Sequence, residues 1–201
     1  MSNENKVQFN LKNVHFAPLT EGAEGPSWGT PIKNPGAVNL ALSQQGEVTP
    51  FHADGMIFYQ ATNNNGYSGD LEVARFVDAV MTGIWKYVKG ATNGLLTEHA
   101  DVEPSAFALL FQIDGDQTDS LYCMFNCTGT RPDITSKTNE STKTPGTNKS
   151  TISCVPLNDG IVFTRTTKDT PESLKKTWFT DVSATYTAAR EAAAGAGQGG
   201  S

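Results

Sequence analysis

Three aspartates, Asp114, Asp116 and Asp119, form a close carboxylate group that could bind a metal ion. Carboxylates at alternating positions are typical of calcium loops, in which their oxygen atoms surround the ion. The segment lacks the glycine at the sharp turn and the bidentate glutamate that complete an EF-hand. We therefore interpret it as an acidic hairpin turn and predict no metal site.

A histidine and an aspartate two residues apart, His52 and Asp54, could form half of a catalytic or metal-binding pair. They stand in a polar segment bounded by a proline and a glycine, which favours a solvated turn. His15 and His99 flank apolar residues and are expected to be ordinary, partly buried imidazoles. The chain has no phosphate-binding loop, dinucleotide fingerprint, nucleophile elbow or zinc-protease motif. The sequence therefore predicts no catalytic residue, no cofactor and no enzyme.

The three cysteines are the remaining candidates for chemistry. Cys123 and Cys127 would face the same side of one strand about 13 Å apart, at ~3.3 Å per residue, which is too far for a disulfide. Cys154 could meet one of them across strands. The spacing lacks the paired-cysteine knuckle of a zinc site. An odd number of cysteines without a secretion signal favours reduced, buried thiols.

The composition indicates one mainly β domain. The chain has 201 residues, 37% of them apolar and only 18% charged, with 19 glycines. The net charge of -6 and the pI near 5.0 have the wrong sign for gripping phosphates, which disfavours a DNA-binding domain. No secretion signal and no apolar run long enough to span a membrane is apparent. We expect no membrane partner and synthesis and folding in the cytosol.

Alternating apolar residues predict the strands that must position any site. They are expected at residues 7–11, 38–43, 56–62, 70–74, 84–88, 95–98, 106–113, 121–128, 151–157 and 161–166. Strands 38–43 and 56–62 are predicted to pair as a hairpin with a long irregular tip, Gln44 to Gly55. Further hairpins are predicted around residues 93–94, 114–119 and 158–160. Strand 106–113 is apolar on both faces, so both faces should be covered.

Two helices are expected beside the sheet. A two-turn helix carries Phe76, Val77, Val80 and Met81 on one face, with Gly83 as a left-handed C-cap. A C-terminal helix opens at Thr170-Pro171 and packs through Leu174, Trp178 and Val182. The predicted organisation is a single domain, residues 1–186, with an extended N-terminal arm, residues 1–37. Residues 187–201 form an Ala/Gly-rich flexible tail whose alanine half has helical propensity.

Several runs resemble the phi13-type family of phage major tail proteins, and more distantly the TP901-1-type tail tube proteins. The runs are KNVHFAPL (12–19), PGAVNL (35–40), GYSGDLEVA (66–74), EPSAFALLF (103–111), DGD (114–116) and NCTGTRP (126–132). Their joint order carries the resemblance. The chain departs from the family in lacking an appended C-terminal immunoglobulin-like domain and a helix-opening proline near Phe76.

The resemblance implies a β-sandwich or half-barrel with a flanking short helix and a C-terminal helix. It further implies a structural virion protein, whose homohexameric rings stack into the tail tube through which the genome is ejected. Implied partners are the tape-measure protein, the tail terminator and distal tail proteins, with double-stranded DNA passing through without specific binding. Two alternatives are a secreted or surface β-sandwich ligand-binding module, for carbohydrate for instance, and a small β-rich hydrolase.

Site expectations follow from this role. The tip of the predicted long hairpin is expected to clamp adjacent rings, through Gln44, Gln45, Glu47, Thr49, Phe51, His52 and Asp54. An acidic lumen would repel DNA and prevent sticking, and its candidates are Glu47, Asp114, Asp116 and Asp119. Lys137, Lys143 and Lys149 are expected on the outer or intersubunit side. The nonregular segments 17–35 and 131–149 are expected to contact neighbouring subunits.

Overall fold

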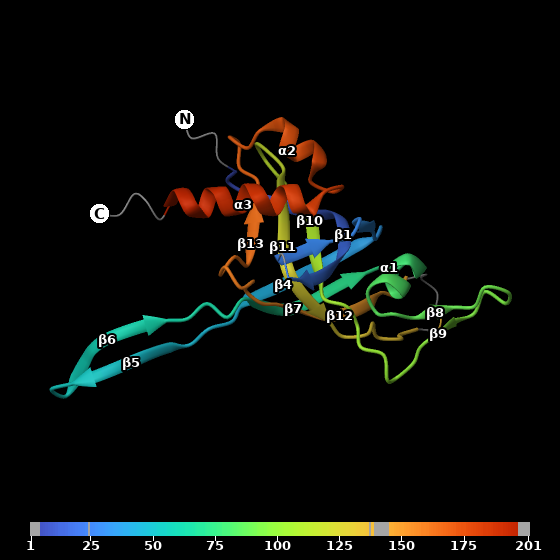
Figure 1. Ribbon diagram of the computed structural model, residues 1–201, viewed down its shortest axis with the longest axis horizontal. Coiled ribbons are helices and arrows are strands. Elements are labelled where there is room, and N and C mark those ends of the chain that lie inside the picture. Colours follow the sequence, from blue (N-terminus) through green and yellow to red (C-terminus); the bar gives the residue numbers. More distant parts are fainter. Residues whose placement is uncertain (1–4, 24, 137, 139–144, 197–201) are drawn as a thin grey trace.

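Two apolar strands in the middle of the chain, β10 (Phe107–Gly115) and β11 (Ser120–Gly129), form the centre of the fold in the computed structural model (Figure 1). The structure describes residues 5–23, 25–136, 138 and 145–196. β10 pairs antiparallel with β11 and with the long N-terminal strand β1 (Gln8–Gly22). The predicted central hairpin is therefore confirmed.

The main sheet has nine antiparallel strands in the order β2-β1-β10-β11-β12-β7-β4, with β3 beside β1 and β13 beside β11. The remaining bounds are β2 (Gly25–Trp28), β3 (Ile32–Lys33), β4 (Ala37–Gln44), β7 (Tyr67–Val73), β12 (Asn148–Cys154) and β13 (Phe163–Arg165). The sheet curls so that β4 contacts β1. The predicted fold class, a mainly β sandwich with short helices, is confirmed.

The main core lies inside the curled sheet and is rich in aromatic rings. Trp85 is fully buried there and contacts the rings of Phe16 and Phe76, with centroids 5.9 and 5.0 Å away. Its Nε1 donates hydrogen bonds to the carbonyl oxygens of Gly129 and Thr130 at 3.2 and 2.8 Å. The helix α1 (Asp78–Gly83) adds Val80 to this core. These contacts connect α1, and the Trp85 that follows it, to the C-terminal end of β11.

A second core covers the opposite face of β10 and β11. Trp178 is buried between α2 (Glu172–Thr177) and α3 (Val182–Ala196), and its Nε1 donates to the Tyr122 carbonyl at 3.3 Å. Figure 1 shows α3 lying across this face. The prediction that the central strands are covered on both sides is confirmed.

The C-terminal helix is divided, contrary to the single helix predicted from Leu174, Trp178 and Val182. The chain turns between α2 and α3, and α3 continues to Ala196, beyond the predicted domain boundary at residue 186. Pro171 is itself the N-cap and there is no side-chain cap hydrogen bond, so the helix begins one residue later than the predicted opening at Thr170-Pro171. The Thr170 hydroxyl instead accepts a hydrogen bond from the Thr167 N–H.

The other predicted helix is present, but it ends differently. α1 covers residues 78–83, and Gly83 is helical rather than a left-handed cap. The left-handed residue is Lys86, with φ of 59°. The predicted hairpin around Asn93-Gly94 is confirmed in a shorter form, as β8 (Val88–Lys89) and β9 (Leu96–Thr97).

Two strand pairings differ from the sequence predictions because they join distant segments. β4 pairs with β7, so the predicted hairpin of residues 38–43 with 56–62 is wrong. β12 and β13 do not pair with each other, because both lie on β11, at opposite ends of it. The predicted nonregular arm 17–35 is also wrong, since β1 continues to Gly22 and β2 folds back on it.

A β-bulge in β11 changes which way its cysteines face. Leu109 pairs with Met124 and Phe107 with Cys127, so β11 has one extra residue between these pairs. Cys123 therefore packs in the second core, beneath the C-terminal helices, while Cys127 packs in the main core opposite Cys154. The prediction that Cys123 and Cys127 face the same side is wrong. All three thiols are free and buried, and burial raises the pKa of Cys123 and Cys127.

His15 is buried, as predicted, whereas His99 is exposed. The His15 ring stacks on Phe179 at 4.7 Å, and its Nδ1 lies 2.8 Å from the Asn13 carbonyl. Burial lowers the pKa of His15 below 6.5, against the opposing effect of that carbonyl, while Lys33 lowers it further.

This lowered pKa predicts a pH dependence of stability. Below about pH 6.5 the His15 imidazole is protonated in the unfolded chain, whereas in the folded protein it stays neutral until the pH reaches its lower folded pKa. The free energy of unfolding should therefore fall as pH drops from 6.5 to the folded pKa. We expect His15→Phe to flatten this part of the curve in urea unfolding between pH 8 and 5, and the exposed control His99→Phe to leave it unchanged. An unaltered slope in His15→Phe would contradict the assignment.

Candidate assembly interface

A two-stranded arm projects from the body of the molecule (Figure 1). It consists of β5 (Val48–Ala53) and β6 (Met56–Thr62), which form a separate two-stranded sheet within the described part of the chain. Asp54 and Gly55 form its tip, with φ of 52° and 77°. Positive φ at both central residues is the geometry of the two-residue turn that best matches the twist of a hairpin.

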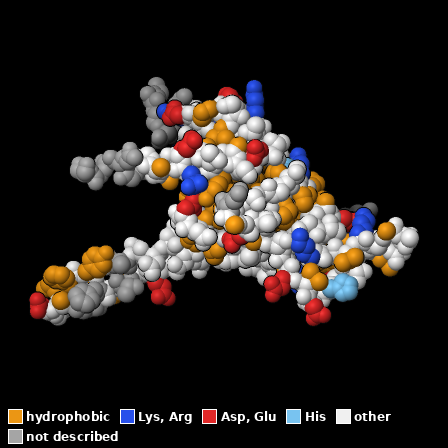
Figure 2. All heavy atoms as spheres, in the orientation of Figure 1, with side chains coloured by type: hydrophobic (Ala, Val, Ile, Leu, Met, Phe, Trp, Pro, Cys, Tyr) orange, Lys and Arg blue, Asp and Glu red, His pale blue; other side chains and the backbone are white. Residues whose placement is uncertain are grey.

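The arm exposes apolar side chains that normally belong in a core. Met56, Ile57, Phe58 and Tyr59 are all exposed, Phe58 at 73%. Figure 2 shows hydrophobic atoms gathered near the end of the arm. An isolated two-stranded ribbon is marginally stable in water, and contiguous exposed apolar surface marks an interaction site. The arm is therefore the strongest candidate for a contact with another protein.

Backbone hydrogen bonds close the base of the arm. The Asn65 N–H donates to the Gln45 carbonyl at 2.8 Å, and the Gln45 N–H donates to the Gly66 carbonyl at 2.8 Å. Gly66 has φ of 97°, and a Cβ there would lie 1.9 Å from the Cys154 carbonyl oxygen. Only glycine allows the strand to approach this closely where the arm joins the sheet.

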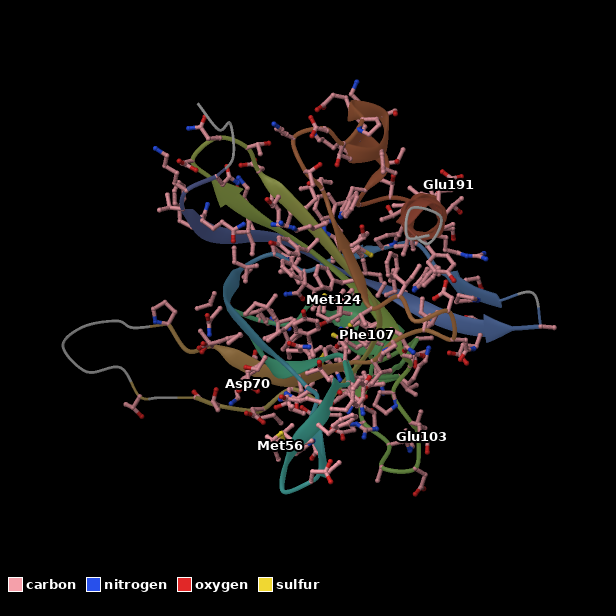
Figure 3. The ribbon with its side chains drawn as sticks, turned by 90° about the vertical axis from the view of Figure 1, so that its left-hand side faces the viewer. Met56, Asp70, Glu103, Phe107, Met124 and Glu191 are labelled. Atoms are coloured by element: carbon pink, nitrogen blue, oxygen red, sulfur yellow. The ribbon has the colours of Figure 1, made fainter. Side chains whose placement is uncertain are left out.

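An apolar groove of about 290 Å³ opens on the body near this base. Its lining comes from five strands and is entirely aliphatic, aromatic or thioether: Leu40, Leu42, Tyr67, Phe111, Ile113, Tyr122, Met124 and Phe163. Figure 3 shows Met124 between the two layers of the curled sheet. β13 pairs with the first half of β11 and β12 with its end, so the groove lies beside the part of β11 that β13 covers.

Stacked and edge-on aromatic rings form much of the groove wall. Phe111 stacks on Tyr122 with centroids 5.0 Å apart, and Tyr122 lies 6.4 Å from Phe163. Phe163 meets Tyr67 edge-on at 5.7 Å, which links β13 to β7. Such pairs add stability beyond burial. Phe163 remains 37% exposed at the rim. The groove is thus preformed and partly open to water.

The residues predicted to clamp rings lie on or beside the arm. Gln44 ends β4, Gln45 and Glu47 lie in the connection, Thr49, Phe51 and His52 belong to β5, and Asp54 is at the tip. The segment is mostly strand, so its prediction as an irregular tip is wrong. The sequence predicts the second strand of the arm, Met56–Thr62, as a partner of residues 38–43, whereas it pairs with β5. Asp54-Gly55 between two apolar runs is the hairpin signal that would have identified it.

The predicted lumen carboxylates fall into two places. Glu47 lies in the connection leading to the arm, whereas Asp114, Asp116 and Asp119 lie at the β10–β11 turn. Asp114 contacts Lys12 at 2.6 Å, and this hydrogen bond holds the pKa of Asp114 below its ordinary range. The turn is the acidic hairpin turn expected from the sequence.

The predicted intersubunit segment 131–149 is held partly by its own subunit. Arg131 Nη2 donates to the carbonyls of His99 and Val102 at 3.0 and 2.7 Å, and Nε contacts Glu98 at 2.8 Å. Lys149, predicted on the outer or intersubunit side, pairs with Asp70 at 3.1 Å. Lys137 and Lys143 lie outside the described residues.

Among the residues that the structure describes, no cluster of three or more histidine, cysteine or carboxylate side chains could hold a metal ion. None of the helices in that part of the chain is both long and apolar enough to cross a membrane. Comparison with protein-family models gives no match, and comparison with curated proteins gives none either.

Proposed function

We propose that this protein is a self-assembling structural subunit of a phage tail tube, in which hexameric rings stack into a conduit for the genome. The observation that carries the proposal is the apolar arm, a ribbon projecting from a β-sandwich with Met56, Ile57, Phe58 and Tyr59 exposed. A surface of this kind is costly in a monomer and is covered in an assembly. The sequence runs that resemble phage tail proteins support the same role.

Strand edges add support. β4 ends the main sheet, so among the described residues one side of its backbone has no neighbouring strand in that sheet. An open edge is a template for pairing with another chain, and closure into a ring removes it. In the proposed tube, lateral contacts between sheets form each ring and the arms connect one ring with the next.

The charge of the chain suits passage of DNA. A net charge of -6 opposes binding to phosphates, and repulsion acts within a Debye length of about 8 Å at physiological salt. In the proposal, Asp114, Asp116 and Asp119 face the lumen, while Glu47 lies with the arm at the junction between rings. The tape-measure protein would fill this lumen during assembly.

Size-exclusion chromatography with negative-stain microscopy of the purified chain tests the proposal. Hexameric rings or tubes are expected, and the fraction of protein in them should increase with protein concentration. A protein that stays monomeric at every concentration, and that binds a carbohydrate or another small ligand, would instead support the β-sandwich ligand-binding module.

A further inference from the structure

We propose that the arm of one copy inserts the side chains of residues 56–59 into the apolar groove between β4, β7, β10, β11 and β13 of a second copy. This inference deepens the proposed function and rests on it only in requiring that copies associate. The groove is the receptor surface that the exposed arm needs, and each chain carries both.

The two surfaces match in chemistry. The arm has no charged residue between Glu47 and Asp54 or between Asp54 and Asp70. The groove is lined by apolar and aromatic side chains from five strands. Burying one against the other therefore places no unpaired charge in an apolar site. A polar peptide or a charged ligand would lose hydrogen bonds in this groove and gain nothing in return.

The groove also has room for such an insertion. Its volume of about 290 Å³ is roughly ten times the ~30 Å³ share of one water molecule. That space accommodates about two large apolar side chains, such as Ile57 and Phe58. The aromatic pairs Phe111–Tyr122 and Tyr67–Phe163 already fix the groove wall, so little ordering is needed on binding.

An arm cannot reach the groove of its own subunit. Leu42 and Tyr67 line the groove and lie in β4 and β7, the two strands that lead into the arm. The ribbon therefore leaves from the rim of its own groove and extends away from the body (Figure 1). Folding back would break the hydrogen bonds between Gln45 and residues 65 and 66. The occupant must come from a second copy.

A contact between two different surfaces is heterologous. Each subunit uses its arm toward one neighbour and its groove toward another, so association continues until a ring closes or a stack ends. An arm-to-arm contact would stop at a dimer. The two geometries predict different behaviour when defective copies are mixed.

The experiment mixes a variant with a defective arm and a variant with a defective groove. The arm variant is Ile57→Asp with Phe58→Asp, and the groove variant is Phe163→Asp at the exposed rim. Matched controls carry the same change at exposed apolar residues elsewhere, Leu95→Asp in the β8–β9 hairpin and Phe9→Asp in β1. Light scattering gives the mass of each preparation.

Each defective variant alone should stop at a small unit, while the controls assemble like the wild type. The mixture should recover association and stop at pairs of that unit, because only the intact arm of one partner and the intact groove of the other remain. If the wild type and the groove variant assemble equally, or the mixture recovers nothing, the arm–groove contact is overturned.

Disulfide trapping gives a second readout that does not depend on the aspartate variants folding. A chain with Ile57→Cys and Phe163→Cys should form crosslinks between copies on mild oxidation, and the native cysteines do not compete because all three are buried. Leu95→Cys with Phe163→Cys should not crosslink. Tubes without the arm–groove crosslink would overturn the inference and leave the proposed function standing. Crosslinked copies that never form rings or tubes would support the arm–groove contact and overturn the proposed tube function. A wild type that never associates would overturn the contact and the function together.

Discussion

Replacing residues 46–64 with Asn-Gly is expected to leave a folded subunit that no longer forms tubes. The Asn65 N–H already donates to the Gln45 carbonyl, which is the bond that closes a two-residue turn. The arm makes its strand pairs within itself, so its removal takes no strand from the main sheet. The free energy of unfolding should change by less than about 1 kcal/mol, while polymerisation should be lost.

Denaturant unfolding and negative-stain microscopy of the same preparation separate these two effects. The matched control exchanges Asn93-Gly94 at the tip of the β8–β9 hairpin for Gly-Gly, which changes another loop without removing apolar surface. That control should still form tubes. Tubes of ordinary length from the armless chain would refute a role of the arm in ring stacking.

Trp85→Ala is expected to lower the free energy of unfolding by about 3–5 kcal/mol, the usual cost of removing a large aromatic side chain from a core. Trp85 is 0% exposed and contacts Phe16 and Phe76. The change also removes the Nε1 donor from the carbonyls of Gly129 and Thr130, and although the Ser150 hydroxyl still donates to the Thr130 carbonyl, the lost hydrogen bonds add to the cost. The expected loss is a large fraction of the total free energy of unfolding of an ordinary domain.

Guanidinium unfolding measures this loss, and two comparisons identify its source. Trp85→Phe retains an aromatic ring but removes the donor, so its loss should be smaller than that of alanine. Tyr59→Ala removes an exposed ring from the arm and should alter subunit stability by about 0.5 kcal/mol at most. Equal losses for Trp85→Ala and Tyr59→Ala would contradict the assignment of the core.

The sequence predicted best those elements whose signal is local. The apolar runs that became β10 and β11 are continuous and separated by an acidic turn, so their pairing follows from neighbouring residues. The prediction that both faces of this hairpin are covered needed only the absence of alternation. Trp178 was identified as a packing residue by its helical spacing, although the helix divides just after it.

The arm was misassigned because its strands look like sheet strands. The runs before and after Asp54-Gly55 have the apolar character of a buried hairpin, and burial is a property of the whole fold. Whether Met56–Thr62 pairs with β4 or with Val48–Ala53 depends on where β7 lies, and β7 pairs with β4. The polar run of residues 63–65 indicates the boundary between two strands, but it does not indicate with which other strands each of them pairs.

The bulge in β11 is invisible for a related reason. Nothing in the run from Cys123 to Cys127 marks an extra residue, because a bulge is defined only by the strand opposite. The groove combines residues from β4 to β13, about 120 positions apart in the chain, at roughly the scale of a whole domain. Local sequence patterns cannot predict a surface built from such distant residues. The sequence therefore predicts the region of the arm as a contact site, but it does not predict the groove.

The distance along the chain between arm and groove has a consequence for biosynthesis. The arm is complete once Thr62 has been made, whereas the groove needs β10, β11 and Phe163. At ~5–20 residues per second, about a hundred further residues take several seconds to translate. During that interval a nascent chain displays its donor ribbon but has no acceptor. In the proposed arm–groove contact, unfinished chains on one messenger therefore have no acceptor for each other's arms, and only a finished subunit supplies one.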